Sequence, residues 1–274
     1  MHKRLWADAI VSGATLLGAT VWGRAPRRGA LRDGAGAGGW QHEDWNALVR
    51  RFVHDGAVDY ATFRRVRRIL RAYLQRIADA RPDSWPDADE QLAFYLNAYN
   101  AWVVYQVIEY APTTSVQQIA GFWTRPFAVG GRNLSLHTLA QAVVRAYGDP
   151  RAVLALSSGT RGGPVLQPWA YTGRDLQAQL DTVTRQFLAD EERGLRYDGV
   201  FHVTHMGSVL QRYAGDWVAP ERMPGPWALL RGVVQPSTAL PALSPWLPPT
   251  ISEMLGRLPP PRVVGLPFDW ALNS

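Results

Sequence analysis

The sequence predicts an α+β protein, rich in helix, that is built around one buried central helix and carries a small sheet. Residues 87–110 are apolar on every side, which is the pattern of a helix inside a domain. Stretches with helical and strand-like spacing follow one another without a repeat. With 47% hydrophobic residues among 274, the chain can bury one sizeable core. We expect residues 40–274 to form a single domain, with residues 219–274 packed on it as a Pro-rich extension.

The N-terminal segment, residues 1–39, is expected to lie outside that domain. A basic start precedes a mostly apolar run over residues 9–22, which is short for a bilayer span and suits the central region of a secretory signal. An uncleaved membrane anchor and a disordered cytoplasmic leader are the alternatives. Residues 34–39 are only glycine and alanine, a flexible linker. We therefore expect an exported, periplasmic or membrane-anchored protein, with membrane association through residues 1–28.

Residues 61–78 have apolar side chains at helical spacing and are predicted to form one amphipathic helix. Its other face carries six arginines: Arg64, Arg65, Arg67, Arg68, Arg71 and Arg76. Such a run is usually a solvated face, and the alternative is a patch that binds phosphate or lipid headgroups. Before it, Asp55-Gly56 predicts a tight turn.

The central helix begins with a predicted capping box, Asp87 and Glu90, and Pro112 follows its end. Asn97 and Asn100 lie one helical turn apart within its apolar run, where an unpaired amide costs about 1–3 kcal/mol. We expect these amides to bind backbone of residues 157–164 or of the segment around Tyr171. They either fix an ordinary irregular segment or hold the working loop of the protein. Asn97, Asn100, Tyr99 and Tyr171 are expected to support a groove beside that loop.

The remaining elements follow from local signals. We expect a hairpin at Gly130-Gly131, a helix from Ser135 to Tyr147, a short buried strand over residues 152–156, a helix from Thr172 to Asp190, strands within residues 194–205 and a helical turn at residues 208–213. Prolines then recur from Pro220 to Pro261 and forbid long regular elements. The last segment should therefore wrap the domain in extended pieces and short helices.

Composition excludes several chemistries. The chain has no cysteine, so it has no disulfide, no thiolate zinc site and no cysteine nucleophile. Its formal charge of +6 rests on arginine, because Lys3 is the only lysine. This charge suits anionic partners, but no nucleic-acid or phosphate-loop motif accompanies it. His202 and His205 are spaced to point to opposite faces of a strand, so we expect no metal site, and no cofactor is indicated.

Several segments, in order, resemble one known family. They are DGAVDY (55–60), QLAFYLNAYNA (91–101), GGRNLSL (130–136), GDPRAVLALSSGTRGGP (148–164), residues 170–188, SVLQRYAGDW (208–217) and FDWALN (268–273). Together they resemble the domain of unknown function 547.

The resemblance implies a papain- or transglutaminase-like arrangement of a cysteine, a histidine and an acidic residue. An Ile-Glu-His triplet typical of the family is replaced here by Leu139, Ala140 and Gln141. The two cysteine positions of its Asn-Cys-x-Ser-x-x-Cys-Pro loop are replaced by Ser158 and Gly163. The acid, the base and the thiol implied by the resemblance are thus all missing.

Three hypotheses follow. The leading one is a catalytically degenerate domain that acts by binding a small molecule, a peptide or a protein. The rival is a serine hydrolase or acyltransferase in which Ser158 is the nucleophile and His137, one turn before Gln141, is the base. The third is a module that binds a membrane surface or another anionic partner through the arginine face of residues 61–78.

Overall fold

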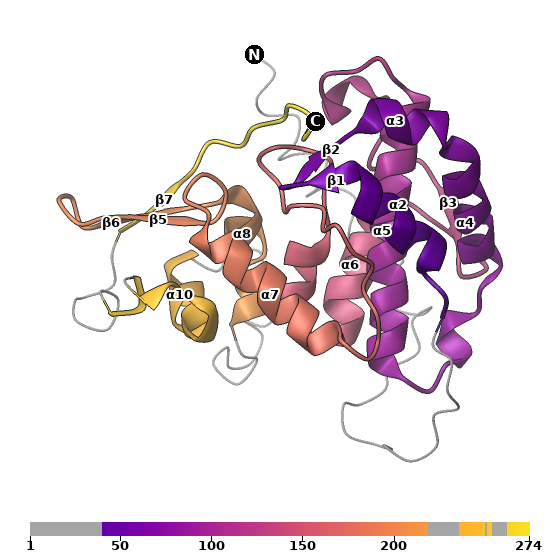
Figure 1. The fold of residues 1–274 in the computed structure, drawn as a ribbon. Helices are drawn as coiled ribbons and strands as arrows, with labels where there is room; N and C mark the ends of the chain where they lie inside the picture. Colours follow the sequence, from indigo (N-terminus) through magenta and orange to yellow (C-terminus); the bar gives the residue numbers. More distant parts are fainter. Residues whose placement is uncertain (1–39, 219–235, 250, 254–261) are drawn as a thin grey trace.

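The computed structural model describes residues 40–218, 236–249, 251–253 and 262–274 (Figure 1). Helix α5, Ala88–Glu109, is buried along most of its length, and helices α3, α4, α6 and α7 pack around it. The Asp87 side chain caps it by accepting hydrogen bonds from the backbone N–H groups of Asp89 and Glu90. Glu90 does not complete the predicted capping box, because its carboxylate accepts instead from the N–H groups of Trp40, at 2.5 Å, and Gly173, at 3.0 Å.

The elements before α5 are short and mostly helical. They are α2 (Glu43–Phe52), β1 (Val53–His54), β2 (Ala57–Val58), α3 (Tyr60–Arg65), α4 (Arg67–Asp79) and the 3-10 helix η1 (Pro82–Ser84). The predicted turn between β1 and β2 is present, with φ of 48° at Asp55 and 82° at Gly56. That turn brings the backbone into the left-handed region, where glycine carries no steric penalty.

The single helix predicted over residues 61–78 is wrong, because Val66 separates α3 from α4. Its φ of −104° and ψ of 16° lie in the sparsely populated bridge region. The apolar spacing continues across the break, since Phe63 and Leu70 are both fully buried. Periodicity therefore predicted which side chains face the core but not the change of helix direction.

After α5 the chain forms η2 (Val116–Gln118) and then a hairpin of β3 (Phe127–Val129) and β4 (Arg132–Leu134). Gly130 and Gly131 form its turn with φ of 60° and 74°, which confirms the predicted hairpin. Helix α6, Leu136–Tyr147, also follows the prediction: the Ser135 hydroxyl accepts from the N–H of Thr138, and left-handed Gly148 ends the helix.

The strand predicted over residues 152–156 is wrong. Residues Pro150–Ala155 form the 3-10 helix η3, which packs against α6 and α7. An apolar run of this length fits a buried strand or a buried helical turn equally well. The N-terminal end of this segment favours the helical turn. Asp149 accepts a hydrogen bond from the N–H of Arg151 at 3.0 Å, and Pro150 supplies a helical φ at the first position.

The next part of the chain contains α7 (Leu176–Ala189), β5 (Leu195–Asp198), β6 (Val203–Met206), α8 (Ser208–Arg212) and α9 (Ala214–Trp217). Helix α7 starts later than predicted, because the Thr172 hydroxyl binds the Asp175 carboxylate within a turn that precedes the helix. Leu154, Phe187 and Met206 belong to a second hydrophobic cluster beside the main core.

The C-terminal part consists of short pieces where it is described: η6 (Pro236–Ala239), α10 (Leu240–Leu243), η7 (Ser244–Trp246) and β7 (Arg262–Gly265). Strand β7 pairs in parallel with β6, which gives a sheet of order β5-β6-β7 (Figure 1). Together with two two-stranded sheets and the helices, this confirms the predicted helix-rich α+β class. The predictions for residues 1–39 and for most of the Pro-rich stretch lie outside the described residues.

Within the described ranges, no helix combines the length and apolarity needed to cross a bilayer. Although α5 is long, its polar side chains have specific partners inside the protein. Asn97 and Asn100 have the most consequential of these.

Candidate functional site

The amides of Asn97 and Asn100 bind backbone on two irregular segments. Asn97 donates to the carbonyl of Tyr171 at 2.8 Å and accepts from the N–H of Tyr171 at 2.9 Å. Asn100 donates to the carbonyl of Ala155 and accepts from the N–H of Ser157, both at 2.9 Å. Both side chains are buried, at 0% and 2% exposure. The partners predicted for the two amides are confirmed, and α5 fixes the start of the loop formed by residues 157–164.

That loop is also held by the C-terminal segment, residues 268–273. Backbone N–H groups of Arg161 and Gly162 donate to the carbonyls of Ala271 and Asp269, each at 2.9 Å. Thr160 and Leu272 form an antiparallel bridge. Gly162 leaves no room for a side chain, because a Cβ there would lie 2.6 Å from the backbone nitrogen of Asp269. The loop therefore serves as a docking edge for the end of the chain.

Asn273 closes this arrangement from the other side. Its side chain accepts from the Tyr60 hydroxyl at 2.7 Å and donates to the carbonyl of Gly56 at 3.2 Å. Its backbone N–H donates to the carbonyl of Gly159, and its carbonyl accepts from Val58. One residue thus ties the loop to the turn between β1 and β2.

Ser158 is half-buried, and its hydroxyl lies 2.6 Å from the hydroxyl of Thr160. His137 lies in the first turn of α6, where its backbone N–H donates to the carbonyl of Trp123 at 3.0 Å. In the part of the chain that the structure describes, no hydrogen bond joins Ser158 to His137. The Ser158–His137 dyad therefore stays a prediction, and the observed partner of the serine is another hydroxyl.

The positions that correspond to reactive residues in the resemblance are occupied by small or unreactive groups. Gly163 adjoins Ser158 so closely that a Cβ at this glycine would lie 2.1 Å from the Ser158 Oγ and 3.3 Å from its Cβ. Ala140 is buried in α6 and packs into the main core, and Gln141 is half-buried beside it. Neither side chain supplies an acid or a base.

Tyr99 and Tyr171 are core residues, exposed by 4% and 2%. Burial raises the pKa of both phenols above the ordinary value, so both are neutral at physiological pH. Tyr171 packs edge-on against Trp169. Among the described residues its hydroxyl has no hydrogen-bond partner. Both tyrosines belong to the main hydrophobic core, and their support of a groove stays a prediction.

The histidine pair predicted to point to opposite faces of a strand is arranged differently. His202 lies in the turn between β5 and β6, with φ of 52°, and its Nδ1 is 2.7 Å from the Tyr197 hydroxyl. His205 lies on β6, opposite Arg196. Within the described residues, no three metal-ligating side chains come together.

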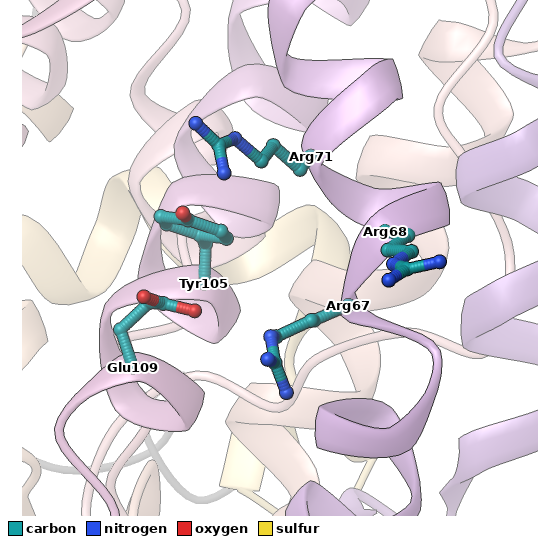
Figure 2. A pocket seen from close by; sticks show the side chains of 5 residues that line it. All are labelled: Arg67, Arg68, Arg71, Tyr105 and Glu109. Carbon is teal, nitrogen blue, oxygen red and sulfur yellow. The ribbon is translucent and has the colours of Figure 1, made fainter.

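A pocket of about 370 Å³ lies between α4 and α5, and its lining includes no residue of the 157–164 loop. It is lined by Arg67, Arg68, Arg71, Tyr105 and Glu109. Figure 2 shows Arg67 and Arg71 extending from α4 toward the two α5 residues, with Arg68 set farther from them. The spacing explains this, because residues four apart lie on the same helix face in both helices.

The pocket carries an excess of positive charge, since three guanidinium groups face one carboxylate. All three arginines and Glu109 are exposed, and Tyr105 is half-buried. Where the structure describes the chain, none of the three guanidinium groups forms a hydrogen bond or an ion pair. Their donors are therefore available to a ligand.

The structure defines a helix-rich α+β protein whose central helix holds an ordered loop through two buried asparagines. Residues 82–188, which include α5, this loop and α7, match the model of the family described as "Protein of unknown function, DUF547". The match over that segment confirms the resemblance found in the sequence. No curated protein and no solved structure matched the chain.

The sequence did not predict two features of the structure, the pocket residues of α5 and a largely buried arginine with two acidic partners. Tyr105 and Glu109 were assigned to the buried helix, although their spacing of four and the charge of Glu109 indicate an open face at its end. Arg151, with a side chain only 10% exposed, binds Asp149 at 2.7 Å and Asp181 at 2.5 Å. The sequence signal for the buried Arg151 was a charged residue that directly follows Asp149-Pro150, a helix-start signal, and begins an apolar run.

Proposed function

We propose that this protein acts by binding an anionic ligand rather than by catalysis, and that the ligand occupies the pocket between α4 and α5. The observation that carries the proposal is the pocket itself, where three exposed guanidinium groups face one carboxylate across about 370 Å³. This combines the leading hypothesis from the sequence with the arginine face that the sequence offered as an anionic site.

The chemistry of the lining favours a phosphate, sulfate or carboxylate group. Guanidinium groups present paired N–H donors that match two oxygens of such an anion. Arg67 and Arg71 stand one helical turn apart and can approach one anion from two sides. Tyr105 adds a ring face and a hydroxyl donor. The Glu109 carboxylate repels further negative charge beside the bound anion and so contributes to selectivity.

The loop of residues 157–164 supports the non-catalytic part of the proposal. A nucleophilic serine needs a base within hydrogen-bond reach, and the partner of the Ser158 hydroxyl is Thr160. The same loop is engaged by backbone hydrogen bonds with residues 268–273. Its role in this proposal is to fix the end of the chain against the core.

Export or membrane anchoring through residues 1–28 remains part of the proposal and rests on the sequence pattern alone. An exported binding domain would meet anionic solutes or polymers outside the cytoplasm. The binding test does not depend on this location.

Calorimetric titration of the purified full chain with pyrophosphate, sulfate and citrate tests the binding site. We expect saturable binding that weakens as salt is raised, and its loss in Arg67→Gln/Arg71→Gln. The control is Arg50→Gln/Arg174→Gln, which removes the same charge from two exposed arginines elsewhere. An equal loss of binding in both double variants would show that net charge alone causes the binding, and would overturn the proposed site.

Enzyme assays test the second part of the proposal, that the protein acts without catalysis. The chain is incubated with peptide, amide and transglutamination substrates and, separately, with a fluorophosphonate probe. We expect neither turnover nor labelling. Turnover that Ser158→Ala abolishes, or labelling at Ser158 that His137→Ala prevents, would establish the serine enzyme in place of the binding domain.

A further inference from the structure

The turn between β5 and β6 exposes two large apolar side chains. Val200 is 87% exposed and Phe201 is 75% exposed, the highest values among the large hydrophobic residues that the structure describes. Figure 1 shows this hairpin extending from the body of the protein, on the opposite side from α4. Single exposed apolar residues are ordinary, whereas two at the tip of a projecting hairpin form a local apolar end.

The turn is held in one shape by its own side chains. The Asp198 carboxylate accepts from the N–H groups of Val200 and Phe201, at 2.9 and 3.1 Å. His202 adopts a left-handed φ of 52°, unfavourable for a residue with a side chain, and its ring binds the Tyr197 hydroxyl. These contacts order the backbone while leaving both apolar side chains in water. The turn therefore presents two apolar side chains on an ordered backbone.

The strand register shows what flanks this tip. Arg196 lies opposite His205, and Asp198 lies opposite Val203, which in turn pairs with Arg262 on β7. Side chains that are directly opposite share a face of the sheet. The other face is buried, as Thr204 and Met206 at 0% exposure demonstrate. Arg196 and Arg262, both exposed, therefore lie on the open face beside the tip.

Charge on this open face favours an anionic partner. Asp198 is the acidic residue among the paired positions of the sheet, and its carboxylate already accepts two hydrogen bonds from the turn. The two arginines are left to face outward, with His205 between the strands that carry them. A short apolar tip beside exposed cations is complementary to the surface of an anionic bilayer, where apolar groups enter the headgroup region and cations meet the lipid phosphates.

We propose that the β5–β6 hairpin is a membrane-contacting element, in which Val200 and Phe201 insert into the interface of an anionic bilayer while Arg196 and Arg262 bind lipid headgroups. This goes beyond the pocket proposed above. Because the hairpin and α4 lie on opposite sides of the molecule (Figure 1), one flat bilayer that contacts the hairpin leaves the pocket open to solutes. Each proposal can therefore fail without the other.

Sedimentation of the full chain with vesicles of phosphatidylserine and phosphatidylcholine, against vesicles of phosphatidylcholine alone, tests this. We expect binding to the anionic vesicles that falls by about a hundredfold in Val200→Ser/Phe201→Ser, since each of the two buried apolar side chains contributes about a factor of ten. The matched control is Ile69→Ser, an apolar residue of α4 that is 46% exposed. Equal binding by the double variant and the control would overturn the proposal, as would no binding by the natural chain.

A second measurement reports on the turn itself. The chain has no cysteine, so Val200→Cys and Ile69→Cys can each be labelled with one environment-sensitive dye. We expect a blue shift and quenching by lipid-phase quenchers at position 200 and not at position 69. A dye at position 200 that remains in water while the protein is bound, for instance through residues 1–28, would overturn the proposal.

Discussion

The side chain of Asn100 closes a hydrogen-bonded ring with the backbone around Ser157, donating to Ala155 and accepting from Ser157 at 2.9 Å each. Ala155 and Ser157 are each only 1% exposed, so neither backbone group has water as an alternative partner. A buried amide on the central helix thus replaces the backbone pairing that the predicted strand would have supplied.

Asn100→Leu should therefore destabilise the protein by about 1–3 kcal/mol, because it leaves a buried carbonyl and a buried N–H unpaired. Chemical denaturation of the variant and of the natural chain measures this. Asn133→Leu, the same change at an exposed position of β4, should shift the free energy of unfolding by no more than about 0.5 kcal/mol. Similar values for the two variants would contradict the structural role of Asn100.

Cysteines introduced at 158 and 163 should form a disulfide. The Cβ position at Gly163 lies 3.3 Å from the Ser158 Cβ, close to the roughly 3.5–4.5 Å of natural disulfides. The chain has no other cysteine to compete. Ser158→Cys/Gly163→Cys should lose both free thiols on mild oxidation, as thiol titration and intact mass detect. The single variant Ser158→Cys should keep its thiol. Two persistent thiols in the double variant would show that the loop differs from this geometry.

The ion pair of Asp149 with Arg151 should matter far more than an exposed pair. Asp149→Asn should cost about 3 kcal/mol, because it leaves the largely buried Arg151 guanidinium short of one charged partner while Asp181 remains. Asp44→Asn makes the same change in the pair with Arg76, whose side chains are 44% and 50% exposed. That variant should cost about 0–1 kcal/mol. Thermal and denaturant unfolding of both variants compare the two sites. Equal losses of stability would contradict the expected effect of burial on the ion pair.

His42 should make the protein less stable in mild acid. Burial, with a contribution from Arg76, lowers the pKa of His42 from 6.5 to about 3 in the folded protein, and its Nδ1 lies 2.6 Å from the Tyr73 hydroxyl. Above pH 6.5 both states hold a neutral ring. Between pH 6.5 and about 3 the unfolded chain binds a proton that the folded chain refuses, so stability falls by up to about 1.4 kcal/mol per pH unit.

The variant His42→Asn isolates this contribution, because its amide can still meet the Tyr73 hydroxyl and does not titrate. Unfolding free energies measured from pH 7 to pH 4.5 should fall more steeply for the natural chain than for His42→Asn. Carboxylates such as Asp181 and Asp190 add their own acid dependence, but they do so in both proteins. Parallel profiles would mean that His42 titrates normally in the folded state.

The sequence by itself determined the parts of this protein that depend on local signals. Apolar residues all around residues 87–110 predicted the buried helix, because a helix without a polar face must be covered. Asn97 and Asn100 within that run predicted partners in neighbouring backbone, since buried amides are costly when unpaired. Ser135, Gly148 and the glycine pair at 130–131 predicted a helix and a hairpin through capping and turn chemistry that needs no distant residue.

Only the tertiary structure decided the features that depend on residues far apart in the chain. The buried run after Asp149 became a 3-10 helix because α6 and α7 cover it and Asn100 satisfies its end, whereas its apolar pattern fits a strand equally well. Helix packing set Tyr105 and Glu109 opposite Arg67 and Arg71 and so formed the pocket. Strand β7 joined β6 in parallel from a segment dense in proline. In each case the deciding interaction is between elements, and a local pattern carries no information about its partner.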